Sequence, residues 1–239
     1  MIKKYEILDW DTKHFGYKVA KVDANNIGLS EYKELIIKLS KKGVKLMYFF
    51  ADLGDNISIK TAKTSGGFLA DEKVVYIREV PIISKPENLK NITSHFKKPL
   101  TSQIKLLALE AGKYSRYKID PNFMNGEFEK LYTEWIKKSL NGEIAKDVLV
   151  YEINKKNVGL ITLGDKDGKC NIGLIAIHPE HRNKGIGTNL VNAGFVKAAG
   201  WGYKKIDVVT QKSNFNAGKF YESLGFKVKS IVNIYHFWL

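Results

Sequence analysis

Residues 178–188 of this chain read HPEHRNKGIGT. An apolar run, 172–177, comes directly before it and is typical of a buried strand. A largely apolar segment, 189–199, follows it and predicts a helix. A strand that turns through Gly185-Ile186-Gly187 into a helix exposes unpaired backbone N–H groups at the positive end of the helix dipole. The stretch therefore predicts a seat for a phosphate or pyrophosphate, with glycines that keep side chains away from those donors.

Two better-known phosphate motifs do not fit this stretch. A P-loop ends in Gly-Lys-Ser/Thr, but here Lys184 precedes the glycines. A dinucleotide-binding turn needs a third glycine, and this chain has Leu190 at that position. The pattern that fits is Arg-x-x-Gly-x-Gly, at Arg182, Gly185 and Gly187. For these six residues alone, an ordinary strand-to-helix turn is the alternative.

The composition is that of a folded, basic protein. The chain has 239 residues, 44% of them hydrophobic, which is ample for one large domain or two small ones. The formal net charge of +14 suggests nucleic acid, but the lysines are scattered in pairs such as 41–42 and 137–138. A cationic surface also attracts coenzyme A and nucleotide-linked substrates over long range, so the charge alone does not choose between them.

The cysteine count and the hydropathy bear on the compartment. The one cysteine, Cys170, permits no intramolecular disulfide and indicates a reducing environment. The sequence has no signal-peptide pattern and no run of eighteen apolar residues. We therefore expect a cytoplasmic protein with no membrane partner.

Residues 1–85 are expected to form a small N-terminal α/β half-domain. Strands are expected at 5–10, 18–22, 46–50 and 74–80, and helices at 30–41 and 57–65. A faint internal repeat relates 43–68 to 202–226, since both run strand, loop, helix, Gly-Phe and strand. The early copy lacks a counterpart of the Arg-x-x-Gly-x-Gly motif, and Lys63 stands where the later copy has Tyr221. We interpret the first half as a degenerate half-repeat that builds scaffold and a substrate wall, with coincidence between two α/β units as the alternative.

A linker and a second α/β (α+β) domain follow. Residues 86–100 have little periodicity and contain Pro86 and Pro99, so they are predicted to be the linker. Residues 101–239 are the second domain, in which helices are expected at 101–112 and 127–140 and strands at 148–153, 158–163 and 169–177. The helix at 189–199 comes next, then a strand at 205–210, a helix at 214–224 and a strand at 227–239.

This order, together with three motifs, resembles the GNAT acyltransferase fold. The Arg182 motif resembles the family's pyrophosphate-binding signature, and residues 175–180 resemble the end of its fourth strand. The run from Asn214 through Ala217 and Tyr221 to Gly225-Phe226 resembles its Asn-x-x-Ala-x-x-x-Tyr-Glu-x-x-Gly-Phe helix. The resemblance covers about residues 101–239. It implies a mixed central sheet with a GNAT-like half-domain before it, acetyl-CoA as co-substrate, no metal, and direct attack of an amine on the thioester.

The resemblance also implies the roles of particular residues. A bulged strand at Leu174, Ile175, Ala176 and Ile177 is expected to hold the pantetheine arm and the thioester carbonyl through its backbone. The pyrophosphate is expected on the turn formed by Arg182, Asn183, Lys184, Gly185, Ile186, Gly187 and Thr188. Asn214 is expected beside the pantetheine, and Tyr221 is expected to protonate the departing thiolate. The alternative for Tyr221 is a tyrosine packed in the core.

A narrower resemblance extends over the whole chain. Residues 8–16, LDWDTKHFG, are similar to the opening of bacterial TDP-fucosamine acetyltransferases and related nucleotide-sugar N-acyltransferases. Residues 114–121, YSRYKIDP, and the later Tyr-x-x-Trp are similar to their Ser-Arg-Phe loop and the helix after it. This implies N-acetylation of a TDP-linked 4-amino-4,6-dideoxyhexose for surface polysaccharide, with Tyr114, Arg116 and Tyr117 as substrate residues. Tyr117 replaces the common Phe and leaves the sugar open. The alternative for Arg116 is a surface arginine paired with Glu127 or Glu129.

Other functions and other chemistry stay open at this point. The acceptor could instead be a protein N-terminus, a polyamine or an aminoglycoside, and the charge leaves a nucleic-acid-binding module as a third reading. The expected partner is a small-molecule nucleotide sugar, nucleic acid is not expected, and a homodimer is left open.

No side chain stands out as general base. Glu143, Asp147 and His178 are unsupported candidates, and a water relay is an alternative. His14, His95, His181 and His236 lack metal-ligand spacing. Cys170 is expected to be structural, and Trp10 and Phe15 are expected in the core.

Overall fold

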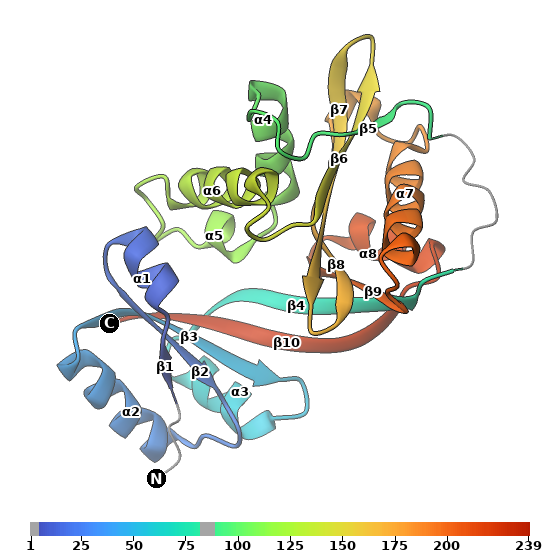
Figure 1. The fold of residues 1–239 in the computed structure, drawn as a ribbon. Helices are drawn as coiled ribbons and strands as arrows, with labels where there is room; N and C mark the ends of the chain where they lie inside the picture. The colour runs from blue at the N-terminus through green and yellow to red at the C-terminus, as the bar shows by residue number, and fades with distance from the viewer. Residues whose placement is uncertain (1–4, 82–88) are drawn as a thin grey trace.

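The computed structural model describes residues 5–81 and 89–239, in which the strands form one ten-stranded sheet (Figure 1). The order across it is β1-β2-β3-β10-β4-β9-β8-β7-β6-β5. The strands are β1 (Glu6–Ile7), β2 (Lys18–Asp23), β3 (Val44–Asp52), β4 (Phe68–Glu79), β5 (Ile92–Ser94), β6 (Asp147–Ile153), β7 (Lys156–Lys166), β8 (Lys169–Ile177), β9 (Lys205–Gln211) and β10 (Lys227–Trp238). The β2–β3 and β8–β9 pairs are parallel and the other neighbours are antiparallel, so the predicted mixed sheet is confirmed.

Helices cover both faces of this sheet. They are α1 (Asp9–Phe15), α2 (Leu29–Lys41), α3 (Asn56–Thr64), α4 (Ser102–Ala111), α5 (Arg116–Ile119), α6 (Glu127–Asn141), α7 (Ile186–Gly200) and α8 (Phe215–Ser223), with a 3-10 turn, η1 (Pro179–His181). Successive side chains of β6 point to opposite faces of the sheet, so they pack into two different cores. Val148 and Val150 pack with residues of α4 and α6, whereas Leu149 packs with residues of α7 and α8.

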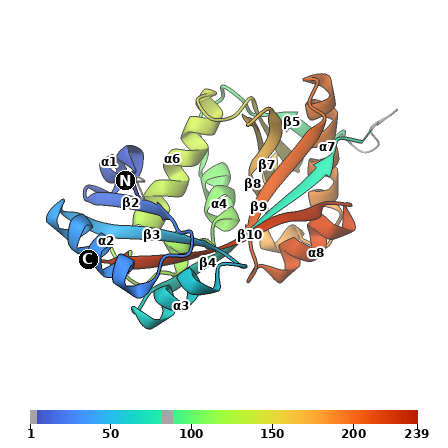
Figure 2. The same ribbon diagram turned by 90° about the horizontal axis from the view of Figure 1, so that it is seen from below.

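The two halves of the chain exchange their last strands. β4 follows α3 in the first half but pairs with β9 of the second, where Lys73 lies opposite Gln211. β10 follows α8 in the second half but pairs with β3 of the first, where Val232 lies opposite Asp52. Figures 1 and 2 show both strands running from one half into the other. These two residue pairs, Lys73 with Gln211 and Val232 with Asp52, occupy equivalent positions in the two copies of the internal repeat. This agrees with a degenerate GNAT-like first half.

The order of elements predicted for residues 101–239 is confirmed, with the one-turn helix α5 added between the first two helices. The division into 1–85, 86–100 and 101–239 stays a prediction, and the strand exchange means that each segment completes the other's sheet. Of the predicted linker, residues 86–88 lie outside the described residues. Ile92–Ser94 form β5, which pairs with β6 at the edge of the sheet.

Two local predictions in the first half are wrong. The strand expected at 5–10 ends at Ile7, because Asp9 begins α1. Acidic residues in its first turn favour the helix, and Gly16 ends it with a φ of 78°, a left-handed conformation that glycine adopts readily. Trp10, expected in the core, has 42% of its surface exposed and stacks on His14.

Within residues 5–81 and 89–239, no helix has the length and apolar character needed to cross a membrane.

Candidate active site

The site begins where two parallel strands separate. β8 and β9 pair from Cys170 opposite Ile206 to Ile172 opposite Val208. Beyond this point β8 continues to Ile177 and β9 to Gln211 without pairing between them. The strands therefore leave an opening in the sheet, and a cavity of about 850 Å³ lies there.

The cavity brings together most of the residues predicted to bind the co-substrate. It is lined by Leu174, Ile175, Ala176, Ile177, Arg182, Asn183, Gly185, Ile186, Gly187, Thr188, Asn214 and Tyr221. Its opposite wall comes from α4, α6 and the loop between them: Glu110, Ala111, Lys113, Tyr114, Tyr132 and Trp135. Of the predicted cofactor-binding residues, Lys184 is not part of the lining, since its ammonium points to the Glu180 carbonyl, 3.1 Å away.

The bulge expected in β8 is present where the strands separate. Against β7, Ile161 lies opposite Ile175 and Leu163 opposite Ile172, so Thr162 faces both Gly173 and Leu174. The Leu174 N–H donates to the Thr162 hydroxyl over 2.8 Å instead of to the strand ladder. Such a bulge redirects the backbone of the residues that follow it. The segment 174–177 thus borders the cavity with one edge free of β9.

The turn into α7 has the shape of an anion seat. Gly185 caps the helix with a φ of 74°, and Asn183 is left-handed with a φ of 59°. A Cβ at Gly187 would stand 3.1 Å from the Phe220 ring of α8, so the second glycine permits close helix packing. The first turn of this 15-residue helix presents its N–H groups where an anion is favoured.

Arg182 lines the cavity, but its guanidinium is already engaged. It forms an ion pair with Glu110 of α4 and donates from Nε to the Ile177 carbonyl over 3.3 Å. Burial alone would raise the pKa of Glu110, but hydrogen bonds from Lys113 and Arg182 lower it. Arg182 therefore ties the turn to both α4 and the end of β8. No sequence pattern indicated Glu110, because its partner lies 72 residues away.

Asn214 and Tyr221 reach the cavity from the start and the last turn of α8. The Asn214 side-chain oxygen accepts from the Ala217 N–H at 3.3 Å, so this residue also caps the helix. Tyr221 is only 3% exposed and packs against Tyr76 with ring centroids 5.6 Å apart. Burial and then Tyr76 raise the pKa of Tyr221 well above its usual value. Its hydroxyl therefore stays protonated at neutral pH and can donate a proton into the cavity.

The three predicted acceptor residues divide between two places. Tyr114 lines the cavity, but Arg116 and Tyr117 lie beyond it, against the first half. The Arg116 guanidinium lies 4.8 Å from the Tyr48 ring centroid and donates to the Tyr117 hydroxyl at 2.6 Å. The alternative, a surface Arg116 paired with Glu127 or Glu129, is wrong, because Arg116 packs on Tyr48. Lys118 pairs with Glu129 instead, and the Asn125 N–H donates to Glu127.

The base candidates from the sequence are not at the cavity. Glu143, Asp147 and His178 are absent from its lining. Asp147 instead pairs with Lys197 at 2.7 Å and accepts from Ser94. Cys170 is fully buried, and burial raises the pKa of its thiol to about 12, as expected of a structural cysteine.

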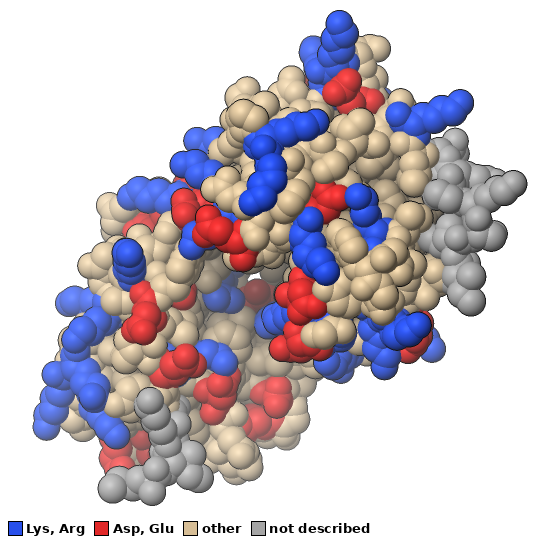
Figure 3. Space-filling view, in the orientation of Figure 1, with Lys and Arg blue, Asp and Glu red and all other residues tan. Residues whose placement is uncertain are grey.

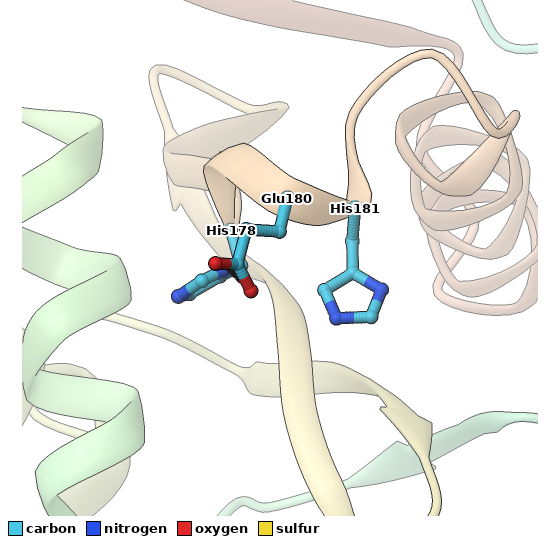
Figure 4. Close-up of side chains that lie close together, drawn as sticks. All are labelled: His178, Glu180 and His181. Carbon is cyan, nitrogen blue, oxygen red and sulfur yellow. Dashed lines mark ion pairs between the residues drawn. The ribbon is translucent and has the colours of Figure 1, made fainter.

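One group of side chains could hold a metal ion, which the spacing of the histidines did not indicate. Donor atoms of His178, Glu180 and His181 lie within 4.8 Å of one another on the turn between β8 and α7 (Figure 4). The His178 and Glu180 side chains are 44% and 83% exposed, so neither is held in a closed site. The expectation that no metal takes part stays a prediction.

Comparison with known proteins finds a family match in the second half. Residues 115–226 match the acetyltransferase (GNAT) family. The spore coat polysaccharide biosynthesis protein SpsD of Bacillus subtilis is 27% identical over 138 residues, which are 58% of this chain and 47% of that protein. The chain spans about half the length of the curated relatives it matches.

Solved structures show the same fold. A GCN5-related N-acetyltransferase from Sphaerobacter thermophilus superposes with a TM-score of 0.60 at 14% identity, covering 98% of this chain and 76% of that one. A tandem GNAT protein from the clavulanic acid biosynthesis pathway superposes with a TM-score of 0.55 at 12% identity, covering 92% and 75%. The expected GNAT fold is therefore confirmed.

Proposed function

We propose that this chain, whose residues 115–226 match the acetyltransferase (GNAT) family, transfers acetyl from acetyl-CoA to the amine of a nucleotide-linked amino sugar. The acceptor we infer is of the TDP-4-amino-4,6-dideoxyhexose type. The observation that carries the proposal is the cavity between β8 and β9, which joins an anion seat on α7 to a buried tyrosine hydroxyl on α8. A thioester donor with a pyrophosphate at its other end needs both.

The residues fit such a donor. The first turn of α7, with Gly185 and Gly187 at its start, would hold the pyrophosphate. The edge of β8 at 174–177 would hold the pantetheine amides and the thioester carbonyl, and Asn214 would lie beside them. Holding the two substrates together removes much of the entropic barrier to a bimolecular reaction.

The chemistry then needs a polarised carbonyl and a proton for the leaving group. Backbone N–H groups next to the β8 bulge would stabilise negative charge on the carbonyl oxygen as the amine attacks. The Tyr221 hydroxyl would give its proton to the departing thiolate.

Two observations support a nucleotide sugar as the acceptor. The curated relative from Bacillus subtilis is named for spore coat polysaccharide biosynthesis, a sugar-based process. The net charge of +14 would draw a diphosphate-linked substrate towards the protein. We place the reaction in the cytoplasm and in the synthesis of a surface polysaccharide; the homodimer stays a prediction.

Steady-state acetylation of a panel of amines tests the proposal. The panel contains TDP-linked 4-amino-4,6-dideoxyhexoses, a polyamine, an aminoglycoside and a peptide with a free N-terminus. We expect the highest kcat/KM with a TDP-aminosugar. Preference for any other member would keep the acetyltransferase and reject the sugar. A parallel DNA-binding titration at low salt tests the hypothesis of a nucleic-acid-binding module, which predicts salt-sensitive affinity.

A further inference from the structure

A hollow lies between the two halves of the molecule. Figure 3 shows it with acidic and basic side chains around it. Two routes lead from the cavity towards the first half. On one, Gln211 lines the cavity, and its side chain lies close enough to Asp71 of β4 to lower the pKa of that carboxyl. On the other, Tyr114 lines the cavity, and Arg116, two residues later, lies close enough to Asp71 to lower its pKa.

Asp71 is a buried carboxyl without a full set of partners. It is 7% exposed, and its Oδ1 has no hydrogen-bond partner in the described part of the chain. No ion pair joins it to Arg116 or Lys73 within residues 5–81 and 89–239, although both cations act on it. Burying an ionised carboxylate in this way is costly unless a partner arrives. The fold thus maintains an unfavourable group beside the candidate active site, which is typical of a functional residue.

The face of the sheet that carries Asp71 also carries other polar side chains. Lys73 lies two residues along the same strand and pairs with Gln211 across the ladder, so the side chains of 71, 73 and 211 share one face. On the β10 side the residue opposite is Ile234, which cannot donate a hydrogen bond from its side chain. The Oδ1 atom of Asp71 is therefore buried without a donor, on the face of β4 that also carries Lys73.

We propose that Asp71 contacts the acceptor amine and acts as the general base of the acetyl transfer, with the cavity residue Gln211 on the same face of the sheet beside it. This rests on the proposed function, because it names the group that activates the acceptor. It also assigns a catalytic role to the first half of the chain, which contributes Asp71 through the exchanged strand β4.

The step balances as follows. The Asp71 carboxylate takes one proton from the acceptor R–NH₃⁺, and the freed nitrogen lone pair attacks the thioester carbon. The C–N bond forms, the C–S bond breaks, and the thiolate takes the Tyr221 proton. The second proton that nitrogen loses returns to the Tyr221 oxygen, and the Asp71 proton passes to water. The products are R–NH–CO–CH₃, coenzyme A thiol and one proton.

The charges around Asp71 suit this task. Burial raises the pKa of Asp71 to about 6, while Arg116, Gln211 and Lys73 oppose the rise and Glu72 adds to it. At neutral pH the group is therefore ionised but close to its protonated state, as an efficient base requires. Burial and then the nearby cations Lys166, Arg116 and Lys21 lower the pKa of Lys73, and the same field would lower that of an acceptor amine. A lower amine pKa makes the proton transfer easier.

The test compares Asp71→Asn with a control on the same strand, Glu72→Gln. Glu72 pairs with Lys212 at 2.8 Å, and as the next residue of the strand it points to the opposite face of β4, so its loss should leave turnover unchanged. We expect Asp71→Asn to lower kcat with the best acceptor of the panel by ~100-fold or more, the usual worth of a general base. The acetyl-CoA dissociation constant from calorimetry should stay within about twofold, because Asp71 is not in the cavity lining. The wild-type kcat/KM should rise with pH through about 6, and the variant should lose this limb.

Turnover within threefold of wild type, or an unchanged pH limb in the variant, would overturn the assignment. A small amine, ethanolamine at high concentration, separates this result from the outcome for the proposed function. If no TDP-aminosugar is acetylated, the sugar proposal fails. The effect of Asp71→Asn on ethanolamine acetylation still decides whether Asp71 is the base. Circular dichroism of both variants shows whether a loss of turnover comes from unfolding.

Discussion

His236 and Asp120 lie 116 residues apart in the sequence and meet inside the protein, with the His236 Nδ1 atom 2.6 Å from the Asp120 Oδ2 atom. His236 is on β10, the strand that the second half gives to the first, and Asp120 follows α5. Trp238 donates from its ring N–H to the same oxygen over 3.0 Å. The pair therefore joins the exchanged strand to the segment that carries Arg116.

We expect His236→Phe to destabilise the protein by ~3 kcal/mol, because it leaves the Asp120 carboxylate buried without its main partner. Urea unfolding at pH 7 measures this. Asp120→Asn keeps a side chain that can accept from both rings, so it should cost less. A loss below about 1 kcal/mol in His236→Phe would mean that the pair does not stabilise the interface between the halves.

The same pair predicts a loss of stability in mild acid. Burial lowers the pKa of His236 to about 4, despite the opposing hydrogen bond to Asp120. The unfolded chain then binds a proton at higher pH than the folded one, so stability falls as pH drops from about 6.5 towards 4. Burial would raise the pKa of Asp120, but hydrogen bonds from His236, Asn122 and Trp238 lower it to about 2. Asp120 therefore extends the loss below pH 4, and urea midpoints from pH 7 to 3 follow both.

Asp71 should act in the opposite direction. Its folded pKa of about 6 lies above the unfolded value, so its contribution favours folding below pH 4 and is lost as pH rises to about 6. We expect Asp71→Asn to leave the free energy of unfolding at pH 7 unchanged or to raise it by up to ~3 kcal/mol. The melting temperature at pH 7 should then be unchanged or higher. The substitution should also make the stability fall more steeply as pH drops, because protonation of Asp71 no longer offsets the loss that His236 causes. A variant that is less stable than wild type at pH 7 would show that the carboxylate is a structural partner of Arg116.

The parts of the site that the sequence predicted are those encoded within one short segment. The Arg182 turn and the Asn214–Tyr221 helix follow from local glycines, caps and spacing. The site residues predicted from these two segments line the cavity, with the exception of Lys184. Asp71 was not predicted, because Asp71 and Gln211 become neighbours only when β4 pairs with a strand of the other half. The same holds for Arg116. Its nearby carboxylates suggested a surface pair, but the Tyr48 ring that it covers belongs to β3.

The two glycines of the α7 turn should affect acetyl-CoA binding for different reasons. Gly185→Ala meets no atom within 4 Å, but its φ of 74° costs about 1 kcal/mol in a residue with a Cβ. Gly187→Val pushes on the Phe220 ring, 3.1 Å from the new Cβ, and should displace α8 from the cavity. We expect a severalfold loss of affinity in the first variant and a larger one in the second, by calorimetry.

Gly168→Ala is the matched control for this pair. Gly168 has a φ of 71° with nothing within 4 Å, and it lies in the β7–β8 hairpin outside the cavity lining. Its substitution should cost similar stability and leave acetyl-CoA affinity unchanged. Wild-type affinity in Gly187→Val would count against the turn as the pyrophosphate seat.

Arg116 should matter for the acceptor and not for the donor. Arg116→Lys keeps the charge but loses the planar group that lies over the Tyr48 ring and bonds to Tyr117. We expect the acceptor KM to rise severalfold while the acetyl-CoA KM stays the same. Lys118→Gln, two residues away and paired on the surface with Glu129, should change neither. A larger effect on acetyl-CoA would move the acceptor site away from the hollow.

Removing the Tyr221 hydroxyl should slow turnover without weakening donor binding. Tyr221→Phe keeps the ring packed against Tyr76 and Phe226, so the fold and the cavity shape persist. The thiolate then leaves without a proton from the protein, which should lower kcat by ~100-fold while the acetyl-CoA dissociation constant changes less than twofold. Tyr235→Phe is the control, since Tyr235 is 1% exposed and lies in the core of the first half. If both variants turn over like wild type, Tyr221 is a packing residue, and the leaving group takes its proton from water in the cavity.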